Sequence, residues 1–183
     1  MMSQYTYSLP LLGSDSIRLL SVMPSKVDTA PIQCQLHNYD LQESDKGTHL
    51  YEALSYVWGG FDDPPQSVSI NGKFIHVTRN LYAALLHLRD RTFERVIWVD
   101  YICINQKDKH EKSRQIQLMA KIYGEANRVI VYLGEAADNS DQSIEYIRSA
   151  AEEDPVHLST DKRNQEAVLE LLKRPWFQRM WVG

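Results

Sequence analysis

The sequence predicts an α/β protein in which a mainly parallel β-sheet is flanked by helices. Apolar runs that are typical of strands alternate with segments of helical periodicity, in the order 96–99, 109–123 and 128–133. Residues 96–99 are too few for a typical helix and are rich in β-branched and aromatic side chains, which favours a central strand buried on both faces. Together these two observations indicate a layered sheet with helical crossovers.

The chain begins with a predicted β-hairpin within about residues 1–40. Its strands are the alternating runs 17–20 and 32–36. A polar stretch follows, and residues 51–58 then form a strand that ends at the glycine pair 59–60.

A second hairpin is inserted before the first helix. The Asn-Gly pair at 71–72 is a strong signal of a tight turn and lies between the apolar runs 68–70 and 74–77. Thr78 or Asn80 can cap the next helix, whose apolar positions share one face: Leu81, Ala84, Leu85 and Leu88.

Three further helices are predicted in the second half. Asp108 and Glu111 have the spacing of a capping box, and Gly124 closes that helix. Its apolar positions are Ile116, Met119, Ala120 and Tyr123, and its polar face, which is a solvated surface or a partner interface, carries Lys112, Arg114, Gln115 and Lys121. A helix capped by Ser140 carries Ile144 and Ile147, and the last helix carries Val168, Leu171 and Leu172 before Pro175.

Length and composition predict one domain over residues 1–183, with its core at about 50–183. Of 183 residues, 43% are hydrophobic and 24% are charged, which is ordinary for a globular protein. The net charge of −4, with both signs interleaved, gives no footprint for nucleic acid or for an anionic membrane. We find neither a membrane-spanning apolar run nor a secretory signal, so we expect a protein of the cytoplasm.

The strand at 96–99 is followed by polar residues that mark a candidate site. Ligands of open α/β sheets bind beyond the carboxyl ends of the strands, where Asp100, Asn105 and Gln106 are placed. Asp100 can orient a ligand hydroxyl or amide, or can cap the following loop. Asn105 and Gln106 can bind and position a ligand, or can hold the loop backbone, but neither can transfer protons near pH 7.

The strand at 51–58 contributes further candidates. Trp58 and Gly59 can form an aromatic wall and a close backbone approach to a ligand, although core packing is the more common role of such a tryptophan. Ser55 is a ligand-binding candidate but has no recognisable histidine and acid partner, so nucleophilic catalysis is not expected.

Metal and cofactor motifs are not found in the sequence. None of the six histidines forms a pair at metal-ligand spacing, and no HExxH, dinucleotide fingerprint or P-loop occurs. Cys34 and Cys103 lie far apart and make no disulfide framework, so we expect both to be reduced.

Three blocks of sequence resemble the fungal heterokaryon incompatibility (HET) domain. They are SYVWGG at 55–60, IWVDYICINQKDKHEKSRQIQLMAKIYGEANRVIVYLGE at 97–135 and RPWFQRMWV at 174–182. The resemblance covers nearly the whole chain, and it implies a role in non-self recognition and cell-death signalling through homotypic or heterotypic protein assembly.

The HET domain is in turn similar to TIR signalling domains, which implies a flavodoxin-like sheet. The end of the chain resembles the TIR pattern Trp-Cys-x-x-Glu, whose glutamate takes part in NAD cleavage. Trp181, a further ligand-binding candidate, matches the tryptophan, but the sequence stops before the glutamate position, so we expect a truncation at this motif.

The resemblance leaves an enzymatic alternative open. NAD is then the substrate or ligand, and a stand-in carboxylate is needed, for which Asp100 is the first candidate. Glu52, Asp62 and Glu135 are the others. The sequence favours a non-enzymatic role for this chain, with no certain cofactor and no metal.

Overall fold

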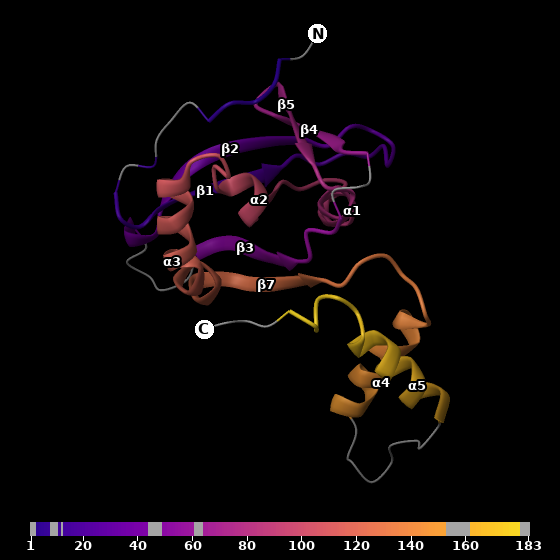
Figure 1. Cartoon of the computed structure of the whole chain (residues 1–183). Coiled ribbons are helices and arrows are strands. Elements are labelled where there is room, and N and C mark those ends of the chain that lie inside the picture. The colour runs from indigo at the N-terminus through magenta and orange to yellow at the C-terminus, as the bar shows by residue number, and fades with distance from the viewer. Residues whose placement is uncertain are drawn as a thin grey trace. The chain divides into compact units, whose positions relative to one another are not determined.

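The computed structural model describes residues 3–7, 11, 13–43, 49–60, 64–152 and 162–179. The chain divides into two compact units, Met1–Tyr132 and Leu133–Gly183. Figure 1 shows their elements. Each unit is described by itself below.

The first unit is built on a seven-stranded sheet in the order β5-β4-β2-β1-β6-β3-β7. Three pairings are parallel (β2 with β4, β3 with β6, β3 with β7) and three are antiparallel (β1 with β2, β1 with β6, β4 with β5). The predicted α/β class is confirmed, and the sheet is mixed because the amino-terminal hairpin lies in its middle. The strands are β1 Ser16–Val22, β2 Gln33–Asp40, β3 His49–Tyr56, β4 Gln66–Ile70, β5 Lys73–Val77, β6 Arg95–Trp98 and β7 Ala126–Tyr132.

Both predicted hairpins are confirmed. β1 and β2 pair along their whole length, from Ser16 opposite Asp40 to Val22 opposite Cys34. The β4–β5 turn has positive φ at both central residues, 51° at Asn71 and 76° at Gly72, which matches the twist of the flanking strands. That turn conformation is the reason why an Asn-Gly pair occurs here.

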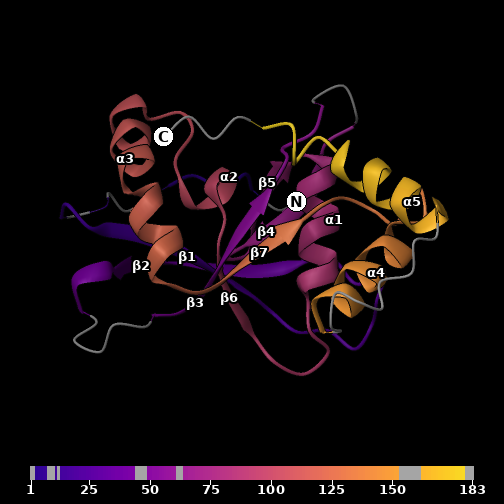
Figure 2. The ribbon, with the colours of Figure 1, turned by 90° about the horizontal axis from the view of Figure 1, so that it is seen from below.

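Helices α1 (Arg79–Leu88) and α3 (Lys109–Glu125) cover opposite faces of the sheet. Tyr51, two residues before Ala53, shares a face with Trp98, because Ala53 and Trp98 are partners in the parallel β3–β6 register. On that face the Tyr51 hydroxyl donates to Ile122 O of α3 at 2.7 Å. The other face holds Tyr132, whose ring lies 5.9 Å from that of His87 in α1. In Figure 2 the helices α1 and α3 are seen apart from each other.

The core lies around β1 and β6. All seven residues of β1 are buried, since this strand has a neighbour on each side and helices over the sheet. Ile97, Trp98 and Val99 have no exposed surface, which confirms the predicted strand buried on both faces. α1 contributes its predicted apolar face, Leu81, Ala84, Leu85 and Leu88.

Thr78 is the residue that caps α1. Its hydroxyl accepts from Leu81 N at 3.3 Å. Asn80 lies inside the helix, and its side-chain amide donates to Val57 O at the end of β3. Of the two predicted caps, the first is therefore confirmed.

The predicted apolar face of α3 is right at Met119 and Tyr123, which pack against the core, and wrong at Ile116 and Ala120, which are exposed. Ile116 is 52% exposed, whereas Ile122 is buried. Gln115, predicted on the solvated face, is fully buried and donates to Ser16 O at 2.8 Å. Gly124 does not close the helix, which continues through Glu125. The inward face of α3 departs from the apolar pattern because it includes two polar residues, Glu111 and Gln115, that have buried hydrogen-bond partners in β1.

Asp108 caps α3 as predicted. Its carboxylate accepts from His110 N at 2.9 Å and from Glu111 N at 3.0 Å. These backbone N–H groups, led by that of Glu111, lower the pKa of Asp108 because they stabilise the charged form. The Glu111 side chain does not return to this cap, and its partners are described with the site.

The second unit contains α4 (Ser140–Glu152) and α5 (Lys162–Leu172). Ser140 is the first helical residue rather than a cap, and its hydroxyl accepts from Ala137 N at 3.3 Å. The Arg174 guanidinium donates to Leu133 O at 3.2 Å and to Ala137 O at 3.0 Å. Arg174 therefore connects the end of the unit to its beginning.

Candidate functional site

The carboxyl ends of β3 and β6 meet through Asp100 and Trp58. The chain leaves β6 at Val99 and enters a one-turn helix, α2 (Asp100–Cys103). The carboxylate of Asp100 accepts from Trp58 Nε1 at 3.0 Å and from Tyr101 N at 2.7 Å. Asp100 thus holds the first turn of α2 and the end of β3 together. Trp58 and Asp100, which were both predicted at the site, are therefore in contact. Asp100 also accepts from a backbone N–H of the segment that follows β6.

A second aromatic ring, that of Tyr101, packs against the donor Trp58. The rings of Trp58 and Tyr101 make an edge-to-face contact with centroids 5.2 Å apart. The Lys112 ammonium lies 6.0 Å from the Trp58 ring centroid. Trp58 therefore contributes an aromatic contact as well as a hydrogen-bond donor.

Gly59 meets two constraints that a larger residue would not. Its φ is +82°, a conformation that side chains disfavour, and a Cβ atom there would lie 3.3 Å from the Cβ of Asn80. The close neighbour is the start of α1. Gly59 thus allows the chain to turn from β3 past this helix.

The loop after α2 is fixed by hydrogen bonds at both predicted amide residues. Gln106 Nε2 donates to Asp100 O at 2.8 Å, and Asn105 Oδ1 accepts from Lys107 N at 3.2 Å. Gln106 Oε1 is buried and has no hydrogen-bond partner in the part of the chain that the structure describes. Gln106 therefore has one structural bond and one open acceptor.

A buried ion pair between Arg18 of β1 and Glu111 of α3 holds the same loop. The bidentate contacts are 2.6 and 3.0 Å long, and the two side chains are only 4% and 8% exposed. Arg18 also donates to Cys103 O at 3.1 Å, while Glu111 Oε1 accepts from Asn105 N at 2.7 Å. Sequence reasoning missed this pair. Arg18 and Glu111 are 93 residues apart, and no local pattern indicates that the two side chains are in contact.

Burial and hydrogen bonding shift the ionisation of groups around this loop. Desolvation lowers the pKa of Arg18, but the hydrogen bond and charge of Glu111 outweigh it and the net pKa is raised. Desolvation raises the pKa of the Cys103 thiol to about 12 and also raises that of the Tyr7 hydroxyl. Cys103 therefore stays a neutral thiol, as the sequence led us to expect.

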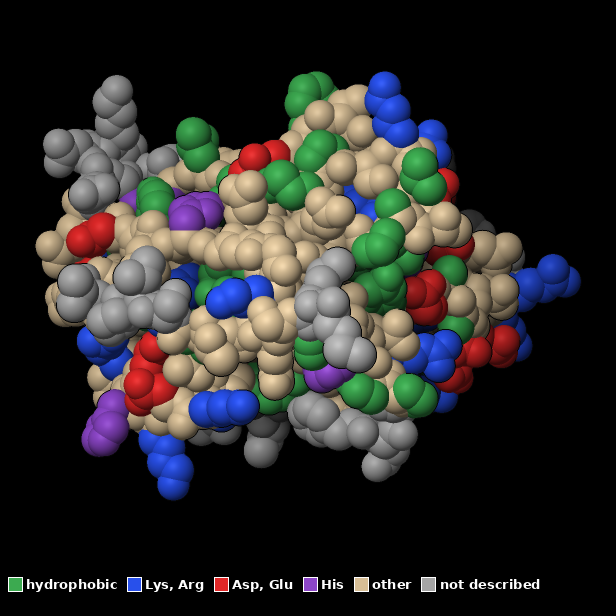
Figure 3. All heavy atoms as spheres, turned by 90° about the horizontal axis from the view of Figure 1, so that it is seen from above, with side chains coloured by type: hydrophobic (Ala, Val, Ile, Leu, Met, Phe, Trp, Pro, Cys, Tyr) green, Lys and Arg blue, Asp and Glu red, His purple; other side chains and the backbone are tan. Residues whose placement is uncertain are grey.

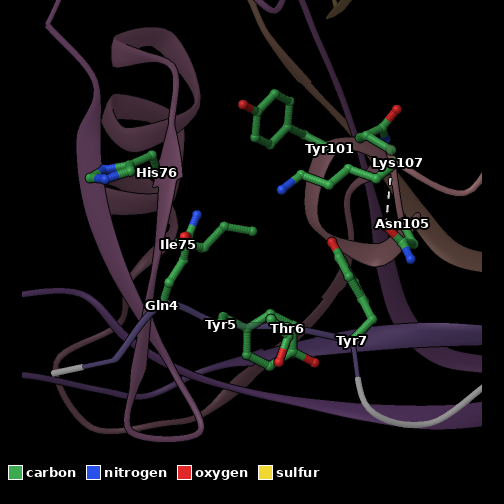
Figure 4. Close-up of a pocket in the computed structure, with 10 residues that line it drawn as sticks. Gln4, Tyr5, Thr6, Tyr7, Ile75, His76, Tyr101, Asn105 and Lys107 are labelled. Carbon is green, nitrogen blue, oxygen red and sulfur yellow. Dashed lines mark hydrogen bonds between the residues drawn. The ribbon is translucent and has the colours of Figure 1, made fainter.

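A cavity of about 380 Å³ opens beside the loop, as Figure 4 shows. Its walls come from the amino-terminal segment, β5, α2 and the loop after α2. The described lining residues are Gln4, Tyr5, Thr6, Tyr7, Ile75, His76, Tyr101, Asn105, Gln106 and Lys107.

The amino-terminal wall, residues 3–7, is a strap that is bonded on two sides. Phe74 N of β5 donates to Ser3 O at 3.0 Å, and Tyr5 N donates to Phe74 O at 2.7 Å. The Tyr7 hydroxyl donates to Ile102 O at 2.7 Å, and its ring lies 4.8 Å from the Arg18 guanidinium. The strap therefore joins β5 to α2 across the cavity.

The structure brings only part of the predicted set to the cavity. Asn105 and Gln106 line it, whereas Trp58, Gly59 and Asp100 form the neighbouring cluster. Ser55 is buried within β3 and is not among the lining residues. Trp181 lies outside the described residues.

Sequence reasoning missed the strap and Lys107. The alternation of Tyr5 and Tyr7 is the pattern of a short strand, and it was the signal that could have found this wall.

Two of the four candidate stand-in carboxylates, Glu52 and Asp100, are held by other partners. Glu52 forms ion pairs with Arg95 at 2.5 Å and with Arg128. Asp100 is bonded to Trp58 and Tyr101 N, as described above. Glu135 belongs to the second unit, and Asp62 lies outside the described residues.

In the part of the chain that the structure describes, no group of three or more His, Cys, Asp or Glu side chains could hold a metal ion. On the face drawn in Figure 3, acidic and basic side chains are interspersed. None of the described helices is both long and apolar enough to cross a bilayer.

Comparisons with known proteins identify the class of this chain. Residues 51–183 match the family described as "Heterokaryon incompatibility protein (HET)", so the chain belongs to this family and the resemblance seen in the sequence is confirmed.

Heterokaryon incompatibility protein 6, OR allele, from Neurospora crassa, is 31% identical over 175 residues, which cover 87% of this chain. They cover 25% of the relative, so the chain spans about a quarter of that protein's length. No solved structure matches, and the kinship with TIR domains stays a prediction.

Proposed function

We propose that this chain acts in heterokaryon incompatibility by assembling with a second copy of itself in the cytoplasm, and that assembly triggers cell death. Support comes from the family, from the relative in Neurospora crassa and from one observation in the second unit. That observation is an apolar surface on α4 and α5.

Two pairs of large apolar side chains are exposed on these helices. Their exposed fractions lie between 42% and 58%, although α4 and α5 pack together. Each pair has the i, i+3 spacing that places both members on one helix face. Exposed apolar faces of this kind mark interaction sites. The pairs are Ile144 with Ile147 and Leu169 with Leu172.

The charges beside this surface favour a second copy as the partner. On α4 the exposed Glu145 and Arg148 form an ion pair, and Glu170 of α5 pairs with the exposed Lys173 just after this helix. A two-fold axis brings the same patch of both copies together, so that each sign can meet its opposite. The surface is therefore apolar and is flanked by balanced charges, which would not repel a second copy.

Sedimentation of the full 183-residue chain over a range of concentrations tests this proposal. We expect the average mass to rise with concentration for the native chain and to stay monomeric for Leu169→Glu and Ile147→Glu. Gln142→Glu adds the same charge at an exposed position of α4, two residues before Ile144 and therefore off the face that carries Ile144 and Ile147, and this variant should assemble normally. In fungal hyphae only the assembling variants should cause cell death.

A monomeric native chain at high concentration that also fails to bind a full-length relative would rule this proposal out. Equal assembly of Ile147→Glu and Gln142→Glu would show that association uses a different surface.

The competing function is NAD cleavage. A ribosyl cation needs a carboxylate beside the sugar. No carboxylate is among the described lining residues of the cavity, and Glu52 and Asp100 are held by other partners. This favours assembly over catalysis. Nicotinamide release from NAD by the purified chain, lost in Asp100→Asn, would overturn that preference.

A further inference from the structure

We propose that the cavity between the strap and the loop after α2 binds a small aromatic anion, a carboxylate or a phosphate ester that also carries an N–H or O–H donor. Lys107 would hold the anionic group, and Gln106 Oε1 would accept from the donor. This binding site does not depend on the proposed assembly.

The anionic group follows from the charges of the cavity. Figure 4 shows the Lys107 side chain extending across the cavity toward Ile75. Its ammonium forms no ion pair with the described residues, and the described walls contain no carboxylate. The Arg18 charge beneath Tyr7 is already compensated by Glu111. A ligand anion would therefore meet the exposed Lys107 ammonium, which has no ion-pair partner among the described residues, and would meet no carboxylate in the described lining.

The hydrogen-bond donor follows from Gln106. Its side chain is held in place by the bond from Nε2 to Asp100 O, so the position of Oε1 is fixed. Oε1 is buried without a partner in the described part of the chain, and such an acceptor is costly to leave unpaired. Gln106 is a lining residue of the cavity, so a ligand N–H or O–H group that reaches this buried oxygen would satisfy it.

The aromatic part follows from the tyrosines. Tyr5 and Tyr7 pack edge to face at 5.2 Å on one side of the cavity, and Figure 4 shows Tyr101 on the opposite side of Lys107. Ligand pockets of this size are mostly apolar with few polar groups that fix orientation. Burial raises the pKa of Tyr5, Tyr7 and Tyr101, so all three hydroxyls stay protonated at neutral pH.

Matched pairs of probes test this proposal with the full chain. Indole-3-carboxylate with indole is the carboxylate arm, and adenosine 5′-monophosphate with adenosine is the phosphate arm. In calorimetric titrations we expect at least one anion to bind about tenfold more tightly than its neutral counterpart, the effect of one charge-assisted hydrogen bond at a partly exposed site. The arm that binds identifies the anionic group.

Three variants assign the contacts. Lys107→Met should remove the preference for the anion, and Gln106→Leu should weaken anion and neutral counterpart alike. Lys109→Met removes the same charge from an exposed residue that does not line the cavity and should bind as the native chain does.

The proposal fails if neither anion binds the folded chain at up to about 10 mM, beyond the millimolar limit of weak specific binding. It also fails if Lys107→Met keeps the anion preference of Lys109→Met. Circular dichroism and a cooperative melt of each variant show that the comparison is between folded proteins.

Discussion

The buried Arg18–Glu111 pair makes a quantitative prediction. Glu111→Ala leaves the guanidinium with no opposite charge in a site where both side chains are at most 8% exposed. Breaking a buried ion pair in this way costs about 3–5 kcal/mol. The substitution also removes the acceptor of Asn105 N. Because domains are stable by only about 5–15 kcal/mol, we expect a large fall in the free energy of unfolding.

A double-mutant cycle of Arg18→Met, Glu111→Leu and the two combined, measured by urea denaturation, checks this reasoning. Arg18→Met leaves the Glu111 carboxylate buried and should cost a similar amount. Arg18→Met combined with Glu111→Leu removes both charges, and we expect it to be more stable than either single variant, since apolar replacements of buried pairs are often neutral. A Glu111→Ala loss below about 1 kcal/mol, or a double variant as unstable as the sum of the single ones, would refute this account.

Three further substitutions or conditions test other parts of the first unit. Thr78→Ala removes the cap of α1 and should lower the free energy of unfolding by about 1 kcal/mol in urea denaturation, with Thr78→Ser as the control that keeps the hydroxyl. Trp58→Phe removes the donor to Asp100 and should lower the free energy of unfolding by about 1–3 kcal/mol. If the loss is no larger than that caused by substituting an exposed aromatic residue, this hydrogen bond is unimportant for stability. Burial raises the pKa of Cys34 and Cys103 from 9.0 to about 12, so the unfolded chain releases these protons first and the free energy of unfolding should fall as pH rises from 9.0 to about 12. If the free energy of unfolding of Cys34→Ala falls with pH as steeply as that of the native chain, Cys34 does not contribute to this pH dependence.

The order of strands and helices could be predicted from the sequence because local signals agree with the fold. The Asn71-Gly72 turn, the Thr78 cap and the buried run before Asp100 each have one favourable local structure. Sheet order could not be predicted in the same way. The β1–β2 hairpin lies between β6 and β4, a placement that depends on long-range pairing rather than on local pattern.

The inward face of α3 shows why polar core residues escape sequence reasoning. A hydrophobic pattern assumes that buried positions are apolar, but Glu111 and Gln115 are buried. Their partners, Arg18 and Ser16 O, are about a hundred residues away in the chain. The strand-end argument named two residues that line the cavity, Asn105 and Gln106, whereas the second wall of the cavity comes from the amino-terminal strap, which no strand-end argument includes.

The first fifty residues are expected to be necessary for the folding of the region that matches the HET family, residues 51–183. Without β1, the strand β6 loses one of its two neighbours, and Glu111 is buried without Arg18. Four fully buried apolar side chains of β1 contribute about 6–12 kcal/mol of burial, comparable to the whole stability of a domain. A 51–183 fragment should therefore show no cooperative thermal transition by calorimetry, while the full chain shows one. A fragment that melts at the same temperature as the full chain would mean that β1 only covers a core that is stable without it.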